Sequence, residues 1–212
     1  VDRRDADDPF SAAEILFCES VALIAGRLLD RYEMSERLQH LEPEDPVTGV
    51  LRYTAFIERL GREFERSITY SHPIGVLLID VEGYGQLLDF CGAEGARDVL
   101  RRVGTTIQGQ IRGVDMIGRY GPDEFIVALT DTAPDKVGPM VHEIRSSLAG
   151  IRVAPFTEGI RIAGGALCLP DLQESPGLDE VLHQLRANLL RARRRGGNRI
   201  VLSSPGHEPS EL

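Results

Sequence analysis

Carboxylates at two places in the sequence have the spacing of a metal site. Asp80 ends the apolar run 75–80, and Asp123 with Glu124 follows the turn at Gly121-Pro122, ahead of another apolar run. If these runs are neighbouring strands, the carboxylates converge on one edge of a sheet. Mg²⁺ takes such oxygen ligands when it also keeps waters and substrate phosphates. An acidic turn that only faces solvent has the same spacing, so spacing alone leaves both interpretations open.

The composition favours a soluble globular domain without a nucleic-acid or membrane partner. The 212 residues are 42% hydrophobic, and 33 acidic residues against 24 basic ones give a net charge of -9. That length suits one domain with some extra helix, and no apolar run reaches the roughly 18 residues of a membrane helix. The acidic balance disfavours a polyanion as partner. The six arginines between 186 and 199 are interpreted as a helix end with a solvated face.

Cysteine and histidine spacing predicts neither a disulfide framework nor a metal cluster. Cys18, Cys91 and Cys168 lie far apart in apolar surroundings, as buried free thiols do, and the five histidines show no ligand spacing. The sequence starts at Val1 without a basic segment ahead of an apolar stretch. We therefore expect no signal peptide, a cytoplasmic location and a sequence taken from a longer chain.

A long helix is predicted over residues 12–41, ahead of prolines at 43 and 46 that end it. Four of its apolar residues recur at the spacing of a coiled-coil seam, namely Phe17, Val21, Ile24 and Leu28. A helix that lies on its own domain is the alternative. We place a signalling and dimerisation helix at 1–43, a second domain at 44–204 and a disordered tail at 205–212.

The second domain alternates between helical and strand periodicity. Helices are predicted at 56–64, 99–111, 137–148 and 178–195, and strands at 75–80, 116–120, 124–129, 160–169 and 199–202, the fourth strand broken by Gly164-Gly165. A sheet layered with helices in this way is an α/β sandwich of the ferredoxin-like sort.

Four motifs follow one another in this domain. They are Asp45-Pro-Val-Thr-Gly-Val-Leu51, Leu77-Leu-Ile-Asp-Val-Glu-Gly-Tyr84, Arg119-Tyr-Gly-Pro-Asp-Glu-Phe125 and Ala192-Arg-Arg-Arg-Gly-Gly-Asn-Arg-Ile200. In order and in the gaps between them they resemble the motifs of the GGDEF domain of diguanylate cyclases, which join two GTP molecules into cyclic di-GMP. The resemblance implies a nucleotidyl-cyclase palm with a ferredoxin-like central sheet.

The resemblance assigns the family's metal ligands to Asp80 and Asp123. The glutamate that follows in the family's motif is also present here, as Glu124. The second glycine of the family's hairpin is replaced by Pro122, which has no N–H and so removes a donor at the phosphate site. The resemblance therefore implies a vestigial Mg²⁺ site. No cofactor is required, and Mg²⁺ is expected there only if a nucleotide binds.

The positions that would hold GTP have changed more. By the resemblance, guanine is read by an Asn and an Asp, which fall on Leu88 and Arg97; neither accepts the guanine N–H donors. A buried polar edge left unpaired is rejected on the order of 10⁴-fold. The family's phosphate-binding Lys, Lys and Arg fall on Gly85, Arg193 and Gly197, and only Arg193 keeps a charge. We therefore expect a degenerate cyclase.

Ahead of the hairpin, Arg112-Gly-Val-Asp115 resembles the Arg-x-x-Asp inhibitory site that binds the family's product. Arg donates to guanine O6 and N7 or to a phosphate, and Asp accepts from guanine N–H groups. A supporting Arg of this site aligns near 142–143, where none stands, and Arg145 is the nearest substitute. In the structural alternative, Arg112 caps the preceding helix and Asp115 lies in the following turn.

The leading hypothesis is a catalytically inactive GGDEF domain that acts as a cyclic di-GMP receptor through Arg112 and Asp115, with Arg145 as a third ligand. It would dimerise through its N-terminal helix and signal to a protein effector that the sequence does not identify. The alternatives are a weak diguanylate cyclase that uses Asp80 and Asp123 with Mg²⁺, and a pseudoenzyme that binds no nucleotide and serves only as a dimerisation module.

Overall fold

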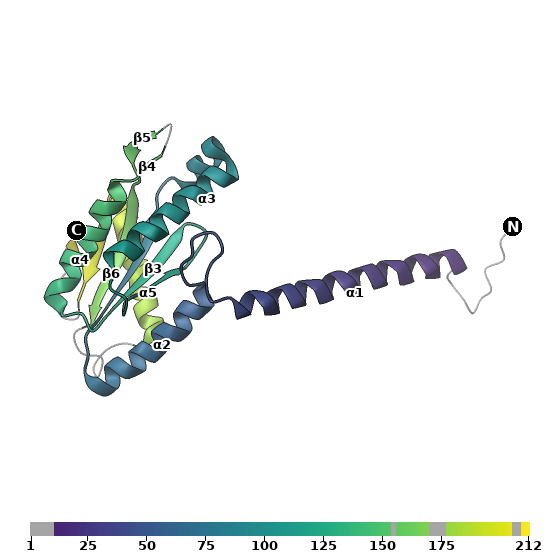
Figure 1. The fold of residues 1–212 in the computed structure, drawn as a ribbon, viewed down its shortest axis with the longest axis horizontal. Helices are drawn as coiled ribbons and strands as arrows, with labels where there is room; N and C mark the ends of the chain where they lie inside the picture. The colour runs from purple at the N-terminus through teal and green to yellow at the C-terminus, as the bar shows by residue number, and fades with distance from the viewer. Residues whose placement is uncertain (1–10, 154–155, 170–176, 205–208) are drawn as a thin grey trace. The chain divides into compact units, whose positions relative to one another are not determined.

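The structure is a computed structural model that describes residues 11–153, 156–169, 177–204 and 209–212, and the side chains of 12, 28–41 and 156–158 lie outside the description. The chain divides into two units, Val1–Pro43 and Glu44–Leu212 (Figure 1). Each unit is described by itself below.

The described part of the first unit contains one helix, α1 (Ala12–Leu41). It begins at Ser11, whose hydroxyl accepts from the Glu14 N–H at 3.3 Å while the Glu14 carboxylate accepts from the Ser11 N–H at 2.8 Å. This reciprocal cap satisfies donors that a helix start leaves open. Phe17, Val21 and Ile24 of the predicted seam are all exposed, and the side chain of Leu28 lies outside the description. Among the described residues, no helix is long and apolar enough to cross a membrane.

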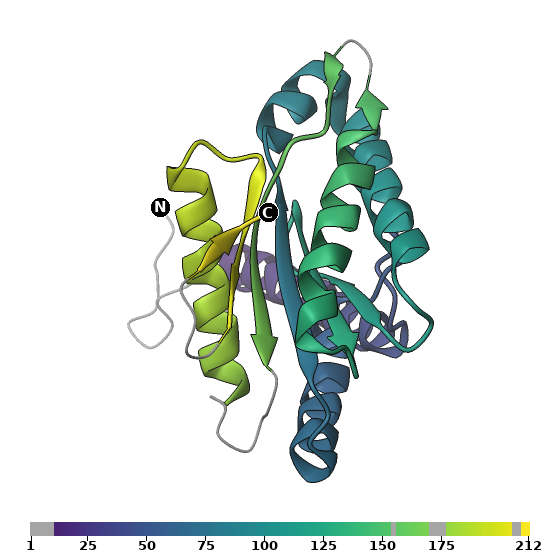
Figure 2. The same ribbon diagram turned by 90° about the vertical axis from the view of Figure 1, so that its left-hand side faces the viewer.

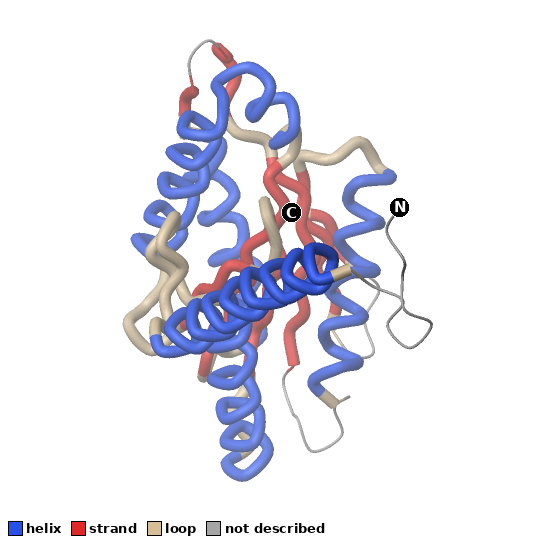
Figure 3. The backbone as a smooth tube through the Cα atoms, turned by 90° about the vertical axis from the view of Figure 1, so that its right-hand side faces the viewer, coloured by secondary structure: helices blue, strands red, loops and turns tan. Residues whose placement is uncertain are grey.

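The second unit is built on a six-stranded sheet (Figure 3). Its order is β2 (Met116–Arg119), β3 (Glu124–Thr130), β1 (Ile74–Val81), β6 (Ile162–Leu169), β7 (Arg199–Ser203) and β8 (Ser210–Glu211). The central strand β1 is antiparallel to β3 and β6, and β7 is parallel to β6. Every residue of β1 is buried, as its continuous apolar run predicts.

Alternate residues of β1 point to opposite faces, so the sheet has two cores. Leu77 and Ile79 pack toward α3 (Tyr84–Gln110) and α4 (Pro134–Ala149), whereas Val76 and Leu78 pack toward α2 (Tyr53–Tyr70) and α5 (Leu178–Arg194). Figure 2 shows these two helix layers on either side of the strands. The predicted α/β sandwich is confirmed.

The prediction that Gly164-Gly165 breaks its strand is wrong. β6 runs through both residues and stays paired with β1 on one side and β7 on the other. A Cβ at Gly165 would lie 2.7 Å from the backbone nitrogen of Leu189 in α5. The glycine therefore serves close packing of α5 on the strand, a use that a pattern of residue types does not distinguish from a break.

The predicted disordered tail also differs from the structure. Residues 205–208 lie outside the description, but Ser210–Glu211 form β8 against β7, and the Leu212 N–H donates to the Ile200 carbonyl at 2.9 Å. The Glu211 carboxylate accepts from Arg195 and, at 2.7 Å, from Arg199. β8 thus pairs with backbone N–H and C=O groups of β7 that would otherwise be unpaired at the edge of the sheet.

Three smaller features were missed or misplaced. A hairpin of β4 (Arg152–Val153) and β5 (Phe156–Gly159) was not predicted. The helix predicted to start at 99 starts at Tyr84 and is interrupted at Gly92, whose φ is 68°. Cys168 is buried as expected and Cys91 is partly buried, but Cys18 on α1 is exposed.

Candidate functional site

The sheet register brings the carboxylates of Asp80, Asp123 and Glu124 to one end of the sheet. Asp80, near the end of β1, lies opposite Glu124, the first residue of β3. The preceding residue, Asp123, accepts a hydrogen bond on its carbonyl oxygen from the Val81 N–H at 3.0 Å. The convergence expected from the sequence is therefore the arrangement in the structure, and we call Asp80, Asp123 and Glu124 the carboxylate end.

An arginine occupies the carboxylate end. Arg193, on the last turn of α5, donates from Nη2 to Oδ2 of Asp80, whose side chain is only 6% exposed. Burial is the main cause that raises the pKa of Asp80, and the hydrogen bond and charge of Arg193 oppose it. The nearby charges of Asp123 and Glu82 raise that pKa further. Arg193 thus offsets only part of what it costs to keep Asp80 ionised.

A second α5 arginine faces the neighbouring carboxylate. Burial raises the pKa of Glu124 and the charge of Arg186 opposes it. The Arg186 guanidinium lies 4.9 Å from the centre of the Tyr120 ring, and its Nε donates to the Tyr120 hydroxyl at 3.3 Å. The ring of Tyr53, at the start of α2, packs edge-to-face on the Tyr120 ring, with 5.2 Å between the ring centres. Arg186 and Tyr53 were not predicted as parts of this site from the sequence, because both reach the hairpin from distant helices.

The carboxylate end does not fit a divalent ion in this arrangement. Its oxygen donors are of the type that Mg²⁺ prefers. However, over residues 11–153, 156–169, 177–204 and 209–212, no group of three or more His, Cys, Asp or Glu residues is placed to hold a metal ion. Oδ2 of Asp80 already accepts from a guanidinium. The predicted metal pair is therefore close in space but not assembled as a coordination site.

The positions aligned with the guanine readers are on the surface of α3. Leu88 is 42% exposed, and Arg97 is exposed and paired with Glu94 at 2.7 Å. Neither side chain offers a hydrogen-bond acceptor.

Gly197, aligned with a phosphate-binding arginine, has a structural reason to be glycine. Its φ is +69°, and a Cβ there would collide with the carboxylate of Glu82. That carboxylate accepts from the Asn198 N–H and from Nε of Arg161, each at 3.2 Å. A side chain at position 197 would be strained by this positive φ and would require the Glu82 carboxylate to move.

A pocket of about 420 Å³ lies beside Glu82. Residues 82–87 and residues 153–161 both contribute to its lining, among them Glu82, Gln86, Ile160 and Arg161. This pocket was not predicted from the sequence, because residues 152–161 carry no clear periodicity and the hairpin that they include was not predicted.

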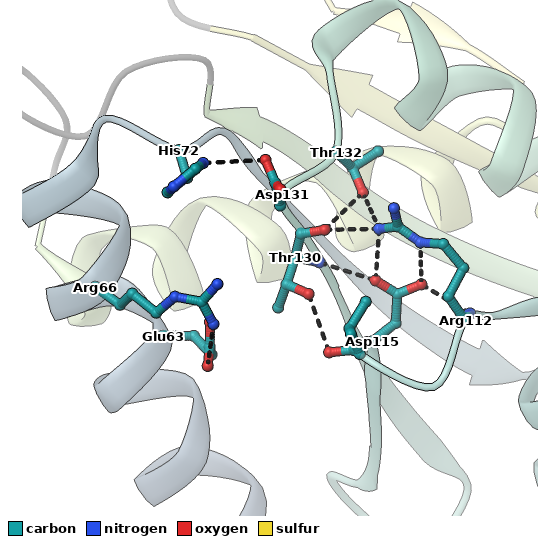
Figure 4. Close-up of polar contacts among 9 residues, drawn as sticks. Glu63, Arg66, His72, Arg112, Asp115, Thr130, Asp131 and Thr132 are labelled. Atoms are coloured by element: carbon teal, nitrogen blue, oxygen red, sulfur yellow. Dashed lines mark hydrogen bonds and ion pairs between the residues drawn. The ribbon is translucent and has the colours of Figure 1, made fainter.

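Arg112 and Asp115 form a hydrogen-bonded cluster at the other end of the sheet (Figure 4). Nε and Nη2 of Arg112 donate to the two carboxylate oxygens of Asp115 at 3.0 and 2.8 Å. Nη2 also contacts the Thr130 carbonyl and the Thr132 hydroxyl, both at 2.6 Å. We call these four residues the Arg112 cluster. The Arg112 guanidinium bonds to residues at the end of β3. It does not cap α3, which is what the structural alternative expected.

The carboxylate of Asp115 is fully engaged within the cluster. Besides the guanidinium, it accepts from the N–H of Arg112 at 2.8 Å and of Thr130 at 3.0 Å, and its side chain is 0% exposed. Arg112 is 48% exposed, and its Nη1 has no hydrogen-bond partner among the described residues. Hydrogen bonding to Asp115 holds the pKa of Arg112 above its ordinary value. The cluster therefore fixes a permanent cation with one free edge.

The structure does not bring Arg145 to this cluster. Nη1 of Arg145 donates to the Asn198 carbonyl at 2.9 Å, just before β7 begins. Thr130 ends β3, whereas β7 runs parallel to β6 and therefore in the direction of β3. The partners of Arg145 and of Arg112 thus lie at opposite ends of the sheet, so Arg145 does not extend the predicted site.

Comparison with known proteins is consistent with this architecture. Residues 43–199 match the family described as diguanylate cyclase, GGDEF domain. Diguanylate cyclase DgcM of Escherichia coli is 24% identical over 181 residues, which are 84% of this chain and 42% of the relative.

Two solved structures share the fold. Diguanylate cyclase SiaD of Pseudomonas aeruginosa, in complex with its activator SiaC, is 25% identical with a TM-score of 0.70, covering 90% of this chain and 74% of that one. The coiled coil and GGDEF domain of DgcB from Caulobacter crescentus, in complex with c-di-GMP, is 21% identical with a TM-score of 0.68, covering 91% of this chain and 100% of that one.

The chain spans less than half the length of DgcM. The match over 43–199 nevertheless includes β1, β2, β3 and β6 in full and ends at the first residue of β7, and it contains both the carboxylate end and the Arg112 cluster. The chain belongs to the GGDEF domain family of diguanylate cyclases.

Proposed function

We propose that this chain is a catalytically inactive GGDEF domain that acts as a cyclic di-GMP receptor through the Arg112 cluster. One observation carries the proposal: a half-exposed guanidinium is held in place by a buried carboxylate, with Nη1 free to donate. Cyclic di-GMP offers such a donor two phosphates and the O6 and N7 acceptors of two guanines. A charge-assisted, two-pronged hydrogen bond suits either acceptor.

Within this proposal the two residues have different roles. Arg112 contacts the ligand. Asp115, whose oxygens already accept four hydrogen bonds, positions Arg112 and does not itself accept from guanine. The c-di-GMP complex of the structural neighbour DgcB supports the ligand class. Arg145 has no part in the proposed site, since its partner lies at the other end of the sheet.

The carboxylate end supports the absence of turnover. Leu88 and Arg97 offer no acceptor to a guanine edge, and Pro122 offers no N–H to a phosphate. Arg193 is bound to Asp80, where the family's metal would have to bind. We accordingly propose that GTP and Mg²⁺ do not form a productive complex here.

The proposal includes dimerisation through α1 and signalling to a protein effector. The exposed side chains of Phe17, Val21 and Ile24 give α1 a seam for a second copy. The activator bound to SiaD and the coiled coil of DgcB support such partners. The cytoplasmic location expected from the sequence stays a prediction.

Isothermal titration calorimetry with cyclic di-GMP tests the receptor function. The parent should bind, and Arg112→Met should bind about 10- to 100-fold more weakly, because it loses one or more charge-assisted hydrogen bonds. Arg101→Met is the matched control: Arg101 also pairs with an aspartate three residues away, Asp98 at 3.2 Å, but on the open surface of α3. No heat in the parent, or equal affinity in Arg112→Met, would contradict the proposal.

Incubation with GTP and Mg²⁺, followed by chromatography of the nucleotides, tests the inactivity. We expect unchanged GTP. Formation of cyclic di-GMP that is abolished in Asp123→Asn would show instead that the chain is a weak cyclase.

Sedimentation velocity tests the dimer. Ile24→Glu should convert a dimer to a monomer, since it buries a charge in the seam. Ala22→Glu places the same charge at least about 100° away around the helix and should leave the dimer intact. A monomeric parent would remove this part of the proposal.

A further inference from the structure

Asp80 is a buried carboxylate whose described hydrogen-bond partner is a single arginine. It lies near the end of a fully buried strand, and its side chain is 6% exposed. A buried carboxylate is stable only with a counter-charge and a hydrogen-bond donor. Arg193 supplies both through Nη2, from a helix 113 residues away in sequence.

The guanidinium occupies Oδ2, one of the two carboxylate oxygens of Asp80 with which a metal ion could coordinate. A divalent ion at Asp80 would compete with Nη2 for Oδ2, and it would stand within a few ångströms of another cation. A guanidinium does not lose its proton at physiological pH, so it cannot release the carboxylate by titration. The carbonyl oxygen of Asp123 already accepts from the Val81 N–H, which leaves one fewer free oxygen at this end.

We infer that Arg193 is the resident cation of the carboxylate end and keeps divalent ions from binding at Asp80. The side chain carries out, within the fold, the charge compensation that a metal would otherwise supply. This inference does not depend on cyclic di-GMP binding, because the Arg112 cluster lies at the opposite end of the sheet.

Arg193 is 47% exposed, so the guanidinium has room to leave Asp80 for solvent. An ion can then bind only to the fraction of molecules in which the pair is open, and its apparent affinity is reduced by that fraction. Removal of the guanidinium should therefore raise the affinity for a divalent ion, although it adds no ligand.

Titration with Mn²⁺, followed by the electron paramagnetic resonance signal of the free ion, tests this in the full chain. Arg193→Met keeps the length of the side chain without its charge and should bind Mn²⁺ at least about tenfold more tightly than the parent. Arg194→Met is the matched control, since Arg194 is an exposed neighbour on the same turn of α5. It should behave as the parent does. In addition, Mn²⁺ should raise the melting temperature of Arg193→Met more than that of the parent.

Equal Mn²⁺ affinity in the parent and in Arg193→Met would overturn the inference, and so would the absence of binding in both folded proteins. The double variant Asp80→Asn/Arg193→Met should lose the gained affinity; if it keeps it, the ion binds elsewhere and the inference fails. Should Arg193→Met not fold, Arg193→Gln, which can still donate to Asp80 without a charge, carries the same prediction.

Discussion

At each end of the sheet lies an arginine–aspartate pair, and the two pairs, Arg112–Asp115 and Arg193–Asp80, have almost the same exposure. Arg112 is 48% and Arg193 is 47% exposed, while the side chains of Asp115 and Asp80 are 0% and 6% exposed. The surroundings of the two carboxylates differ. Asp115 also accepts from two backbone N–H groups, whereas Asp80 has Asp123 and Glu82 near it.

This difference teaches that the carboxylate's other neighbours decide what an ion pair does. Four donors satisfy Asp115, so its negative charge is stabilised locally and the arginine is held in one orientation with a free edge. Asp80 lies among other acids, so its arginine mainly neutralises charge. In our proposals, the first pair presents its guanidinium to a ligand, whereas the guanidinium of the second pair is taken up by Asp80 and blocks a divalent ion there.

The largest expected effect is the loss of stability in Asp115→Asn, which is compared with the same substitution at Asp80. Asp115→Asn should lower the free energy of unfolding by about 2–4 kcal/mol, because it leaves buried donors without a charged acceptor. Asp80→Asn should change it by about 1 kcal/mol or less, since it also removes repulsion from Asp123 and Glu82. Urea denaturation of both variants measures this. Equal costs would break the comparison.

The pH dependence of stability sharpens the same contrast. The folded pKa of Asp80 is raised above its ordinary value of 3.8, so the folded state holds this proton more tightly than the unfolded state does. That contribution to stability is fully present below about pH 3.8 and is lost as the pH rises through the raised pKa. The pKa of Glu124 is raised above its ordinary value of 4.5, so its contribution is likewise present below about pH 4.5 and is lost as the pH rises through the raised pKa.

Unfolding of the parent and of Asp80→Asn should therefore be compared between pH 4 and pH 7. The parent should lose stability relative to Asp80→Asn as the pH rises across this window. Asp80→Asn/Glu124→Gln should remove both contributions. A parent that gains stability relative to Asp80→Asn on going to neutral pH would show that Arg193 outweighs burial.

A more modest effect is expected at Arg112 itself. Arg112→Lys keeps the charge but cannot donate to both oxygens of Asp115 and to the Thr130 carbonyl from one planar group. We expect a loss of about 1 kcal/mol in stability and about tenfold in cyclic di-GMP affinity, measured by denaturation and calorimetry. Wild-type affinity in this variant would mean that charge alone is recognised.

The smallest effect is expected at Thr132, whose hydroxyl accepts from Arg112 at 2.6 Å and donates to the Thr130 carbonyl at 3.1 Å. Thr132→Val should lower the free energy of unfolding by about 0.5 kcal/mol, because Nη2 of Arg112 loses one of its three acceptors. Cyclic di-GMP affinity should fall only severalfold, since Asp115 still holds the guanidinium. A loss as large as that of Arg112→Met would assign the ligand contact to Thr132.

Much of the fold followed from apolar periodicity. β1 and α5 were predicted within a few residues, because their buried positions repeat at the strand and helix periods. The first half of α3 was missed: of Tyr84–Cys91 only Leu87 is buried, which leaves no stripe. β8 could not be expected from two polar residues, since its pairing depends on the open edge of β7 and on Arg195 and Arg199.

The candidate site was predictable where it depended on strand register and not where it depended on helix placement. The approach of Asp80 to Glu124 needs only that β1 and β3 are neighbours. The contact of Arg193 with Asp80 depends on how α5 packs on β6, which no local pattern specifies. The Arg-x-x-Asp spacing likewise gives no sign that Asp115 is buried against the Thr130 N–H.

A paired calorimetric titration tests the central claim most directly. Cyclic di-GMP and Mn²⁺ are each titrated into the parent, Arg112→Met and Arg193→Met. We predict that the parent binds cyclic di-GMP, and that Arg112→Met binds it about 10- to 100-fold more weakly without gaining affinity for Mn²⁺. Arg193→Met should keep the cyclic di-GMP affinity of the parent and bind Mn²⁺ at least about tenfold more tightly than the parent does. Loss of cyclic di-GMP binding in Arg193→Met, with full binding in Arg112→Met, would place the ligand at the carboxylate end and contradict the account.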